Sequence, residues 1–284
     1  MLTDTHCHLD LEKFDSDREA VLERAVRAGI VRILIPSLNL FSSQEVIKLA
    51  KSHPLLYAAV GVHPTEAGTW VKETSAELRN LLESSEPSET SDTSKIVAIG
   101  EIGLDYYWDS APHETQKNVL RAQLDLAAEA GLPAILHMRE TKDAPHGDCA
   151  DNLLHILEEW CSELRSGKSP LADRPGVLHS FSGSLEMARA AMLLGFYIGV
   201  TGPITFGNAL RRQEIAAELP LDYILIETDA PFQAPHPYRG KRNEPAYVRL
   251  IADKIALLHS CSLERIAEVT SENARRLFAW KETA

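Results

Sequence analysis

Hydrophobic and polar positions follow two patterns that alternate along the chain. Short runs rich in Val, Ile and Leu are each followed by a longer segment with the three-to-four-residue apolar period of an amphipathic helix. The short runs predict strands over residues 2–8, 31–36, 55–61, 96–100, 133–137, 177–179, 196–200 and 223–227. The longer segments predict helices over 15–28, 42–52, 75–83, 113–130, 152–164, 184–194 and 208–218, and further helix from 245 onward with one or two breaks near Cys261 and Thr270.

Eight strands that alternate with helices are typical of an α/β protein with a (β/α)8 barrel of the TIM type. The 284 residues suit one such barrel, so we expect a single domain over 1–284. Polar stretches near 84–94, 140–150 and 166–175 predict flexible surface insertions, because the alternation of strands and helices resumes after each of them.

Two histidines separated by one residue, His6 and His8, stand at the end of the first predicted strand. Side chains alternate between faces in extended chain, so both imidazoles point the same way and can bind one metal ion. Cys7 points to the opposite face and is expected in the core. The alternative is a chance His-X-His near a terminus, because short motifs produce false positives.

Other ionisable residues also follow predicted strands. They are His63, Glu101, His137, His179 and Asp229. In a barrel the carboxyl ends of the strands converge on one face, where active sites lie. Each residue alone has a simpler explanation, such as a hydrogen-bonded core histidine or a turn cap. Their joint placement on one face instead predicts a functional site.

The types of these residues suit two divalent metal ions. Imidazoles and carboxylates with an open coordination position are typical of catalytic metal sites. Glu101 lies between the groups from the first and fifth strands, so its two oxygens are placed to bridge the ions. Such a pair of ions activates water and polarises a phosphoryl or a carbonyl oxygen. Asp229 is expected to hold one ion and to take the proton from the attacking water.

Composition narrows the possible partners. The net charge of −12 argues against a broad nucleic-acid-binding surface. Arg239, Lys241 and Arg242 form a local basic patch that is either a solvated loop or a phosphate contact. The four cysteines match no zinc or redox spacing, and the chain has no apolar run of membrane length and no secretory leader pattern. We therefore expect a cytoplasmic protein that does not bind membranes.

Several motifs in a fixed order resemble those of the TatD family of metal-dependent deoxyribonucleases, within the amidohydrolase-like barrels. The resemblance covers nearly the whole chain. It rests on Asp4-Thr-His-Cys-His8, Gly61-Val-His-Pro64, Gly100-Glu-Ile-Gly-Leu-Asp105, Leu136-His-Met-Arg139, Leu178-His179, Glu227-Thr-Asp-Ala-Pro231, Arg239-Gly-Lys-Arg-Asn-Glu-Pro245 and Asn273-Ala-Arg-Arg-Leu-Phe278.

The resemblance implies a ligand set and an activity. One metal would be held by His6, His8, Glu101 and Asp229, and the other by Glu101, His137 and His179. His63 and Arg139 resemble the family's substrate-phosphate contacts, and Arg242 is a third candidate. The family implies a DNA substrate, cleavage from the 3′ end of single strands by an exonuclease, magnesium, manganese or zinc as the metal, and a monomer.

Two departures from the family pattern affect the substrate assignment. The segments 140–150 and 166–175 are longer than the family usually has, and both are candidates for bordering the site. An alternative function is hydrolysis of a carboxylic ester or amide, such as an aminoacyl ester on RNA or a lactone. A non-catalytic barrel would predict a missing ligand, and none is missing.

Overall fold

Eight parallel strands form one sheet whose spatial order is their order along the chain. The computed structural model describes residues 1–84 and 94–280, so the predicted insertion at 84–94 lies almost wholly outside the described residues. The strands are β1 (Leu2–Asp4), β2 (Ile30–Pro36), β3 (Leu56–Val60), β4 (Ile96–Asp105), β5 (Ala134–Arg139), β6 (Gly176–Leu178), β7 (Tyr197–Val200) and β8 (Ile224–Ile226). The helices are α1 (Arg18–Arg27), α2 (Leu40–Ser52), α3 (Thr74–Glu83), α4 (His113–Ala130), α5 (Asp148–Ser166), α6 (Leu185–Leu194), α7 (Leu210–Glu218), α8 (Val248–Leu258) and α9 (Leu263–Phe278).

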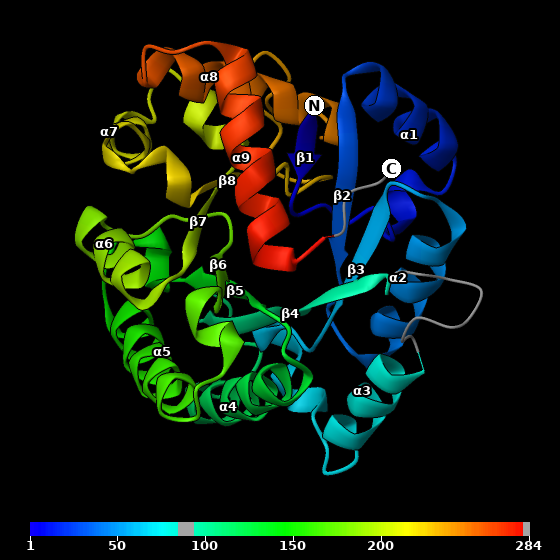
Figure 1. Cartoon of the computed structure of the whole chain (residues 1–284), viewed down its shortest axis with the longest axis vertical. Helices are drawn as coiled ribbons and strands as arrows, with labels where there is room; N and C mark the ends of the chain where they lie inside the picture. The colour runs from blue at the N-terminus through cyan, green and yellow to red at the C-terminus, as the bar shows by residue number, and fades with distance from the viewer. Residues whose placement is uncertain (85–93, 281–284) are drawn as a thin grey trace.

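The sheet curls into a barrel that closes between its first and last strands. Thr5 donates its backbone N–H to Ile226 O (3.2 Å), and a parallel bridge pairs Cys7 with Ala230. The helices surround the strands (Figure 1). The fold is therefore the predicted (β/α)8 barrel.

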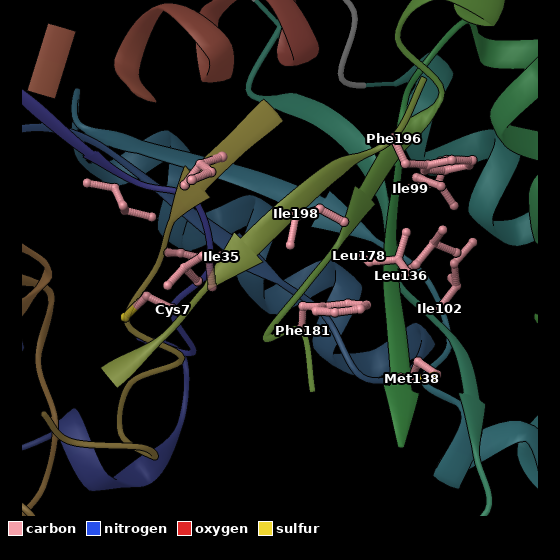
Figure 2. Close-up of a cluster of buried hydrophobic side chains, with 14 of the residues drawn as sticks. Cys7, Ile35, Ile99, Ile102, Leu136, Met138, Leu178, Phe181, Phe196 and Ile198 are labelled. Carbon is pink, nitrogen blue, oxygen red and sulfur yellow. The ribbon is translucent and has the colours of Figure 1, made fainter. Parts of the chain in front are cut away.

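An outer hydrophobic layer joins the strands to the surrounding helices. It combines strand residues such as Ile35, Leu136 and Ile198 with helix residues such as Val46 and Leu124. Figure 2 shows part of this layer, in which side chains from several strands lie together with Cys7. Cys7 is completely buried, which confirms its prediction as a core residue.

An inner hydrophobic layer fills one end of the barrel. Except at the consecutive residues Val97 and Ala98 in the irregular strand β4, its strand members alternate in sequence with those of the outer layer, as expected when successive side chains point to opposite faces. They are Leu34, Tyr57, Ala59, Val97, Ala98, Ile135, Val177, Tyr197 and Leu225. Leu277, Phe278 and Trp280, at the end of α9, pack into the same cluster. Figure 1 shows α9 crossing the ring of strands with its last turn near the centre.

Many element boundaries differ from the prediction by a few residues, and the differences in β4, β1 and α9 matter most. Glu101 does not end its strand, because β4 continues to Asp105. His6 and His8 lie beyond the end of β1 in the segment that closes the barrel. Of the one or two predicted breaks, none occurs at Thr270, since α9 is continuous and the Thr270 hydroxyl donates to Ile266 O (2.8 Å) inside it. The break near Cys261 is confirmed between α8 and α9.

The segment 140–150 follows β5 and is held at both ends by one buried side chain. The Glu140 carboxylate accepts the backbone N–H of Thr141 (2.9 Å) at its start and those of Cys149 (2.9 Å) and Ala150 (3.3 Å) at its end. A Cβ at Gly147 would lie 2.7 Å from the Glu140 carboxyl carbon, so this position requires glycine. Glu140 therefore fixes the first turn of α5 beside β5.

The segment 166–175 lies at the other end of the barrel. It leads from α5 into the beginning of β6. Arg174 donates to Leu277 O (2.9 Å) and Gly131 O (3.1 Å), at the ends of α9 and α4. This segment therefore does not border the carboxyl ends of the strands, in contrast to 140–150. Within residues 1–84 and 94–280, none of the helices is long and apolar enough to cross a membrane.

Candidate metal centre

Glu101 occupies the centre of the site because of an irregularity in β4. The register between β4 and β5 shifts between Ile99 and Ile102, and Glu101 N donates to Ser37 O (3.0 Å), beyond the end of β2. Such bulges reorient single side chains and often lie beside active sites. Glu101 is 2% exposed, and its two carboxylate oxygens face different groups of side chains.

The first donor cluster surrounds Glu101 Oε2. The Nε2 atoms of His6 and His8 lie 3.2 Å apart and are 3.3 and 3.6 Å from this oxygen. Asp229 Oδ1 lies 3.9 Å from His6 Nε2 and 3.7 Å from His8 Nε2. Ligands about 2.1 Å from one tetrahedral cation lie roughly 3.4 Å apart. The atoms of His6, His8 and Glu101 therefore have the spacing of a metal site, and Asp229 Oδ1 lies within 4 Å of both imidazoles.

The second donor cluster surrounds Glu101 Oε1. His137 Nδ1 lies 2.8 Å from this oxygen, His179 Nε2 lies 3.1 Å from it, and His63 Nε2 lies 3.5 Å from it. The ring of His179 also stacks on that of His6, with centroids 3.6 Å apart, so the two clusters adjoin. The structure thus brings together all six predicted ligands and adds His63 to them.

Buried carboxylates orient the two histidines of the second cluster. Asp105 Oδ2 lies 3.0 Å from His137 Nε2, and Glu227 Oε1 lies 3.3 Å from His179 Nδ1. A carboxylate holds a proton on the ring nitrogen that it faces, which leaves the lone pair of the other nitrogen for a metal. In both histidines that other nitrogen faces Glu101 Oε1. The donor set therefore fits a metal on this side as well.

His63 has the opposite arrangement. Its Nδ1 accepts the backbone N–H of Thr65 (3.2 Å), so in the neutral ring the proton lies on Nε2, the atom that faces Glu101. A protonated ring nitrogen donates a hydrogen bond and cannot bind a metal. His63 is therefore placed among the donors but is built to donate to an anion.

Asp229 is held by a network of polar side chains. Gln233 Nε2 donates to Asp229 Oδ2 (2.5 Å) and to Ser180 Oγ (2.6 Å), and Thr201 Oγ1 donates to Gln233 Oε1 (3.0 Å). Asp229, Gln233 and Ser180 all have positive φ angles between 46° and 54°. Left-handed backbone in non-glycine residues costs free energy and concentrates at functional sites. The network leaves Asp229 Oδ1 facing the first cluster.

Burial and neighbouring charges set the protonation states of the first cluster. Burial lowers the pKa of His8 to about 4 and also lowers that of His6. Burial alone would raise the pKa of Glu101, but His179 and His6 outweigh it and the pKa lies well below its usual value. Neutral imidazoles beside an ionised carboxylate are the protonation states that bind metal ions.

The surroundings of the second cluster favour a positive charge on its histidines or on an ion between them. Burial lowers the pKa of His179, but Glu101 and Glu227 outweigh burial and raise that pKa well above its usual value. The pKa of His137 is also raised, because hydrogen bonds to Asp105 and Glu101 outweigh its burial. Glu101, Asp105, Glu227 and Asp229 together carry four negative charges when ionised, which two divalent cations would balance.

The two predicted arginines lie in different surroundings. The Arg139 guanidinium stacks on Tyr107, 3.7 Å from the ring centroid, and its Nε donates to Asp143 Oδ1 (2.8 Å). Both Nη atoms of Arg242 donate to Asp17, each at 2.7 Å, and Nη1 also donates to Lys13 O (2.6 Å). Each guanidinium is thus already paired with a carboxylate.

Sequence reasoning missed Asp105 and Glu227 as supports of the site. Both lie in the motifs quoted for the family, and Glu227 is two residues before Asp229. Two residues is the spacing that puts side chains on the same face of a strand, which was the available signal. Gly199 makes room for Glu227, because a Cβ there would lie 2.3 Å from Glu227 Oε1.

A (β/α)8 barrel with histidine and carboxylate donors at the carboxyl ends of its strands defines the class of metal-dependent hydrolases. A family model described as TatD related DNase matches residues 3–279. The chain therefore belongs to the TatD family and is a metal-dependent hydrolase.

Curated relatives and a solved structure agree with this family. The chain is 41% identical over 278 residues to the uncharacterized metal-dependent hydrolase YabD of Bacillus subtilis, covering 98% of this chain and 99% of that protein. It is 36% identical to a protein of Erwinia tasmaniensis named 3'-5' ssDNA/RNA exonuclease TatD, with 97% and 98% covered. The crystal structure of the TatD homologue YjjV from Escherichia coli superposes with a TM-score of 0.85 at 34% identity, covering 99% of this chain and 98% of that one.

Proposed function

We propose that this chain is a deoxyribonuclease that uses two divalent metal ions, magnesium, manganese or zinc, to remove nucleotides from the 3′ end of single-stranded DNA. One observation carries the proposal: Glu101 directs Oε2 toward His6 and His8 and Oε1 toward His137 and His179. A relative named 3'-5' ssDNA/RNA exonuclease, 36% identical over 283 residues, supports the choice of substrate and polarity.

Six residues would hold the two ions. His6, His8, Glu101 and Asp229 would hold one of them, and Glu101, His137 and His179 would hold the other. When bound, the ions supply Lewis acidity toward a phosphoryl oxygen and lower the pKa of water. Asp105 and Glu227 keep His137 and His179 in the tautomers that leave the required nitrogen free.

Asp229 is the proposed general base. Burial raises the pKa of this carboxyl to about 6, which brings it close to neutral pH. A bound divalent cation would lower this pKa again and so keep the carboxylate ionised and able to accept a proton. Because Gln233 holds Oδ2, the two lone pairs of Oδ1 would serve the ion of the first cluster and the proton of the attacking water.

His63, Arg139 and Arg242 are the proposed substrate contacts. His63 Nε2 carries a proton beside Glu101 and is placed to donate to a phosphate oxygen at the reacting centre. Arg139 is the last residue of β5 and Arg242 lies in the segment after β8, and both would contact phosphates along the strand. Each guanidinium would exchange its carboxylate partner, Asp143 or Asp17, for a phosphate when the substrate binds.

The test uses two single-stranded DNA substrates of the same sequence, one labelled at the 3′ end and one at the 5′ end. Protein stripped of metal is assayed alone and after addition of Mg²⁺, Mn²⁺ or Zn²⁺. The matched control is Asp229→Asn, which has nearly the same shape but has lost the carboxylate. We expect metal-dependent release of labelled mononucleotide from the 3′-labelled strand, a ladder from the 5′-labelled strand, and neither product in the control.

Other outcomes separate the alternatives. Release of labelled mononucleotide from the 5′-labelled strand first would reverse the polarity. Hydrolysis of an aminoacyl ester or a lactone, with both DNA substrates intact under every metal, would replace the nuclease by a carboxylic ester or amide hydrolase.

A further inference from the structure

Phe232 has a fixed backbone at the edge of the first donor cluster. It follows Asp229 by three residues, and its backbone N–H donates to Asp229 O (2.8 Å). Its carbonyl accepts from Asn243 Nδ2 (2.7 Å), and Asn243 is completely buried. Because both backbone groups are held by the site's own loop, the position of the ring follows that of Asp229.

The ring itself is open to solvent beside a metal ligand. Phe232 is 46% exposed, and its ring centroid lies 6.2 Å from that of His8 with an interplanar angle of 71°. His8 directs Nε2 into the first donor cluster. Only the side chain of His8 therefore separates this exposed phenyl ring from the first donor cluster, where the phosphate would react.

A cation accompanies this ring. Lys13 Nζ lies 5.0 Å from the Phe232 centroid. Lys13 is exposed and belongs to the short 3-10 helix Glu12–Phe14, whose Lys13 carbonyl accepts from Arg242. Because this ammonium group lies over the face of the ring, a base that stacks there would take its place, and the displaced ammonium could then contact the phosphate of the same nucleotide.

We propose that Phe232 is a stacking platform for the nucleobase next to the scissile phosphate, with Lys13 placed to contact an adjoining phosphate. This inference rests on the proposed nuclease function and names the part of the substrate that the site recognises. Stacking requires a base whose face is uncovered, so the platform would select unpaired ends and accept all four bases. Phe232 would thereby set the preference for single strands.

The experiment is a double-mutant cycle in which one change is made in the protein and the other in the DNA substrate. The proteins are the unmodified chain and Phe232→Leu, which keeps apolar volume but removes the aromatic face. The substrates are a short single-stranded oligonucleotide and the same strand with its terminal base removed. Dissociation constants are measured by fluorescence anisotropy with metal-stripped protein, in which nothing is cleaved, and kcat/KM is measured with metal added.

We expect the abasic end to weaken binding to the unmodified protein by about fivefold to a hundredfold, the range for loss of one stacked base. Phe232→Leu should weaken binding of the intact strand by a similar factor and respond less than twofold to removal of the base. Phe232→Tyr should restore both values. The control Leu193→Ala truncates another exposed apolar residue, far from the site on α6, and should behave like the unmodified protein.

If Phe232→Leu and removal of the terminal base weaken binding by factors that simply multiply, base and ring are not in contact. That result would overturn the proposal. Binding that Phe232→Leu leaves unchanged, or a complete lack of oligonucleotide binding, would also overturn it. An intact binding cycle without cleavage under any metal would instead keep the platform and reject the nuclease reaction.

Discussion

The two ends of the barrel interior are built from the same strands and have opposite chemistry. At one end Ile135, Val177 and Leu225 pack with the end of α9 in a hydrophobic cluster. Two residues further along the same strands stand His137, His179 and Glu227, which line or support the metal centre. A step of two residues, the period of side chains on one face of a strand, thus separates the residues that pack in the core from those that form the site. Stability should depend on the first set and activity on the second.

The largest expected effect comes from the residue shared by both donor clusters. Glu101→Gln should lower activity by more than the roughly 100-fold caused by loss of a supporting residue, because both clusters lose a charged ligand. Metal bound after dialysis, measured by mass spectrometry, should fall with it, while the melting temperature of metal-stripped protein changes little. Retention of two metal equivalents per chain with full activity would contradict the shared-ligand assignment.

The apolar end should behave in the opposite way. Leu225 is completely buried in the inner cluster, so Leu225→Ala should lower the free energy of unfolding by about 2–5 kcal/mol. Its activity per folded molecule and its bound metal should stay near those of the unmodified chain. Urea denaturation followed by circular dichroism measures the first quantity. A loss of metal without a loss of stability would show that the two ends are not separable.

Glu227, two residues after Leu225 and just beyond the end of β8, provides the matched comparison. Glu227→Gln keeps the size of the side chain but weakens the contact that sets the tautomer of His179. Metal affinity or activity should fall about 10–100-fold, as for other supporting residues of metal sites. Metal titration with a competing chelator measures this. Unchanged affinity would mean that His179 is oriented by its packing alone.

Arg242 should give the smallest effect. Arg242→Ala should raise KM for DNA more than it lowers kcat, because a phosphate contact contributes to binding before the chemical step. Asp17→Asn is the control, since it releases the guanidinium from its ion pair but leaves the positive charge in place. It should leave KM the same or lower it. An unchanged KM in Arg242→Ala would remove this loop from the substrate site.

The sequence predicts the fold and the ligand types because both depend on local patterns. Alternating strands and helices give the barrel, and a histidine or an acid after an apolar strand identifies a residue at its carboxyl end. Contacts between distant segments are not encoded in this way. The pairing of His179 with Glu227, and of Arg242 with Asp17, depends on which segments become neighbours after closure of the barrel. The position of Glu101 inside β4 likewise depends on a register shift that no local pattern reveals.

Glu140 binds both ends of the loop after β5, so the length of this loop can change without moving the metal ligands. This carboxylate ties residue 141 to the first turn of α5, so the residues between these points can vary in number while β5 and its His137 stay in place. The same loop carries Asp143, the ion-pair partner of Arg139, beside the barrel mouth. Residues 141–146 can therefore be exchanged, by variation within the family or by grafting in the laboratory, to change what meets the substrate without rebuilding the catalytic centre.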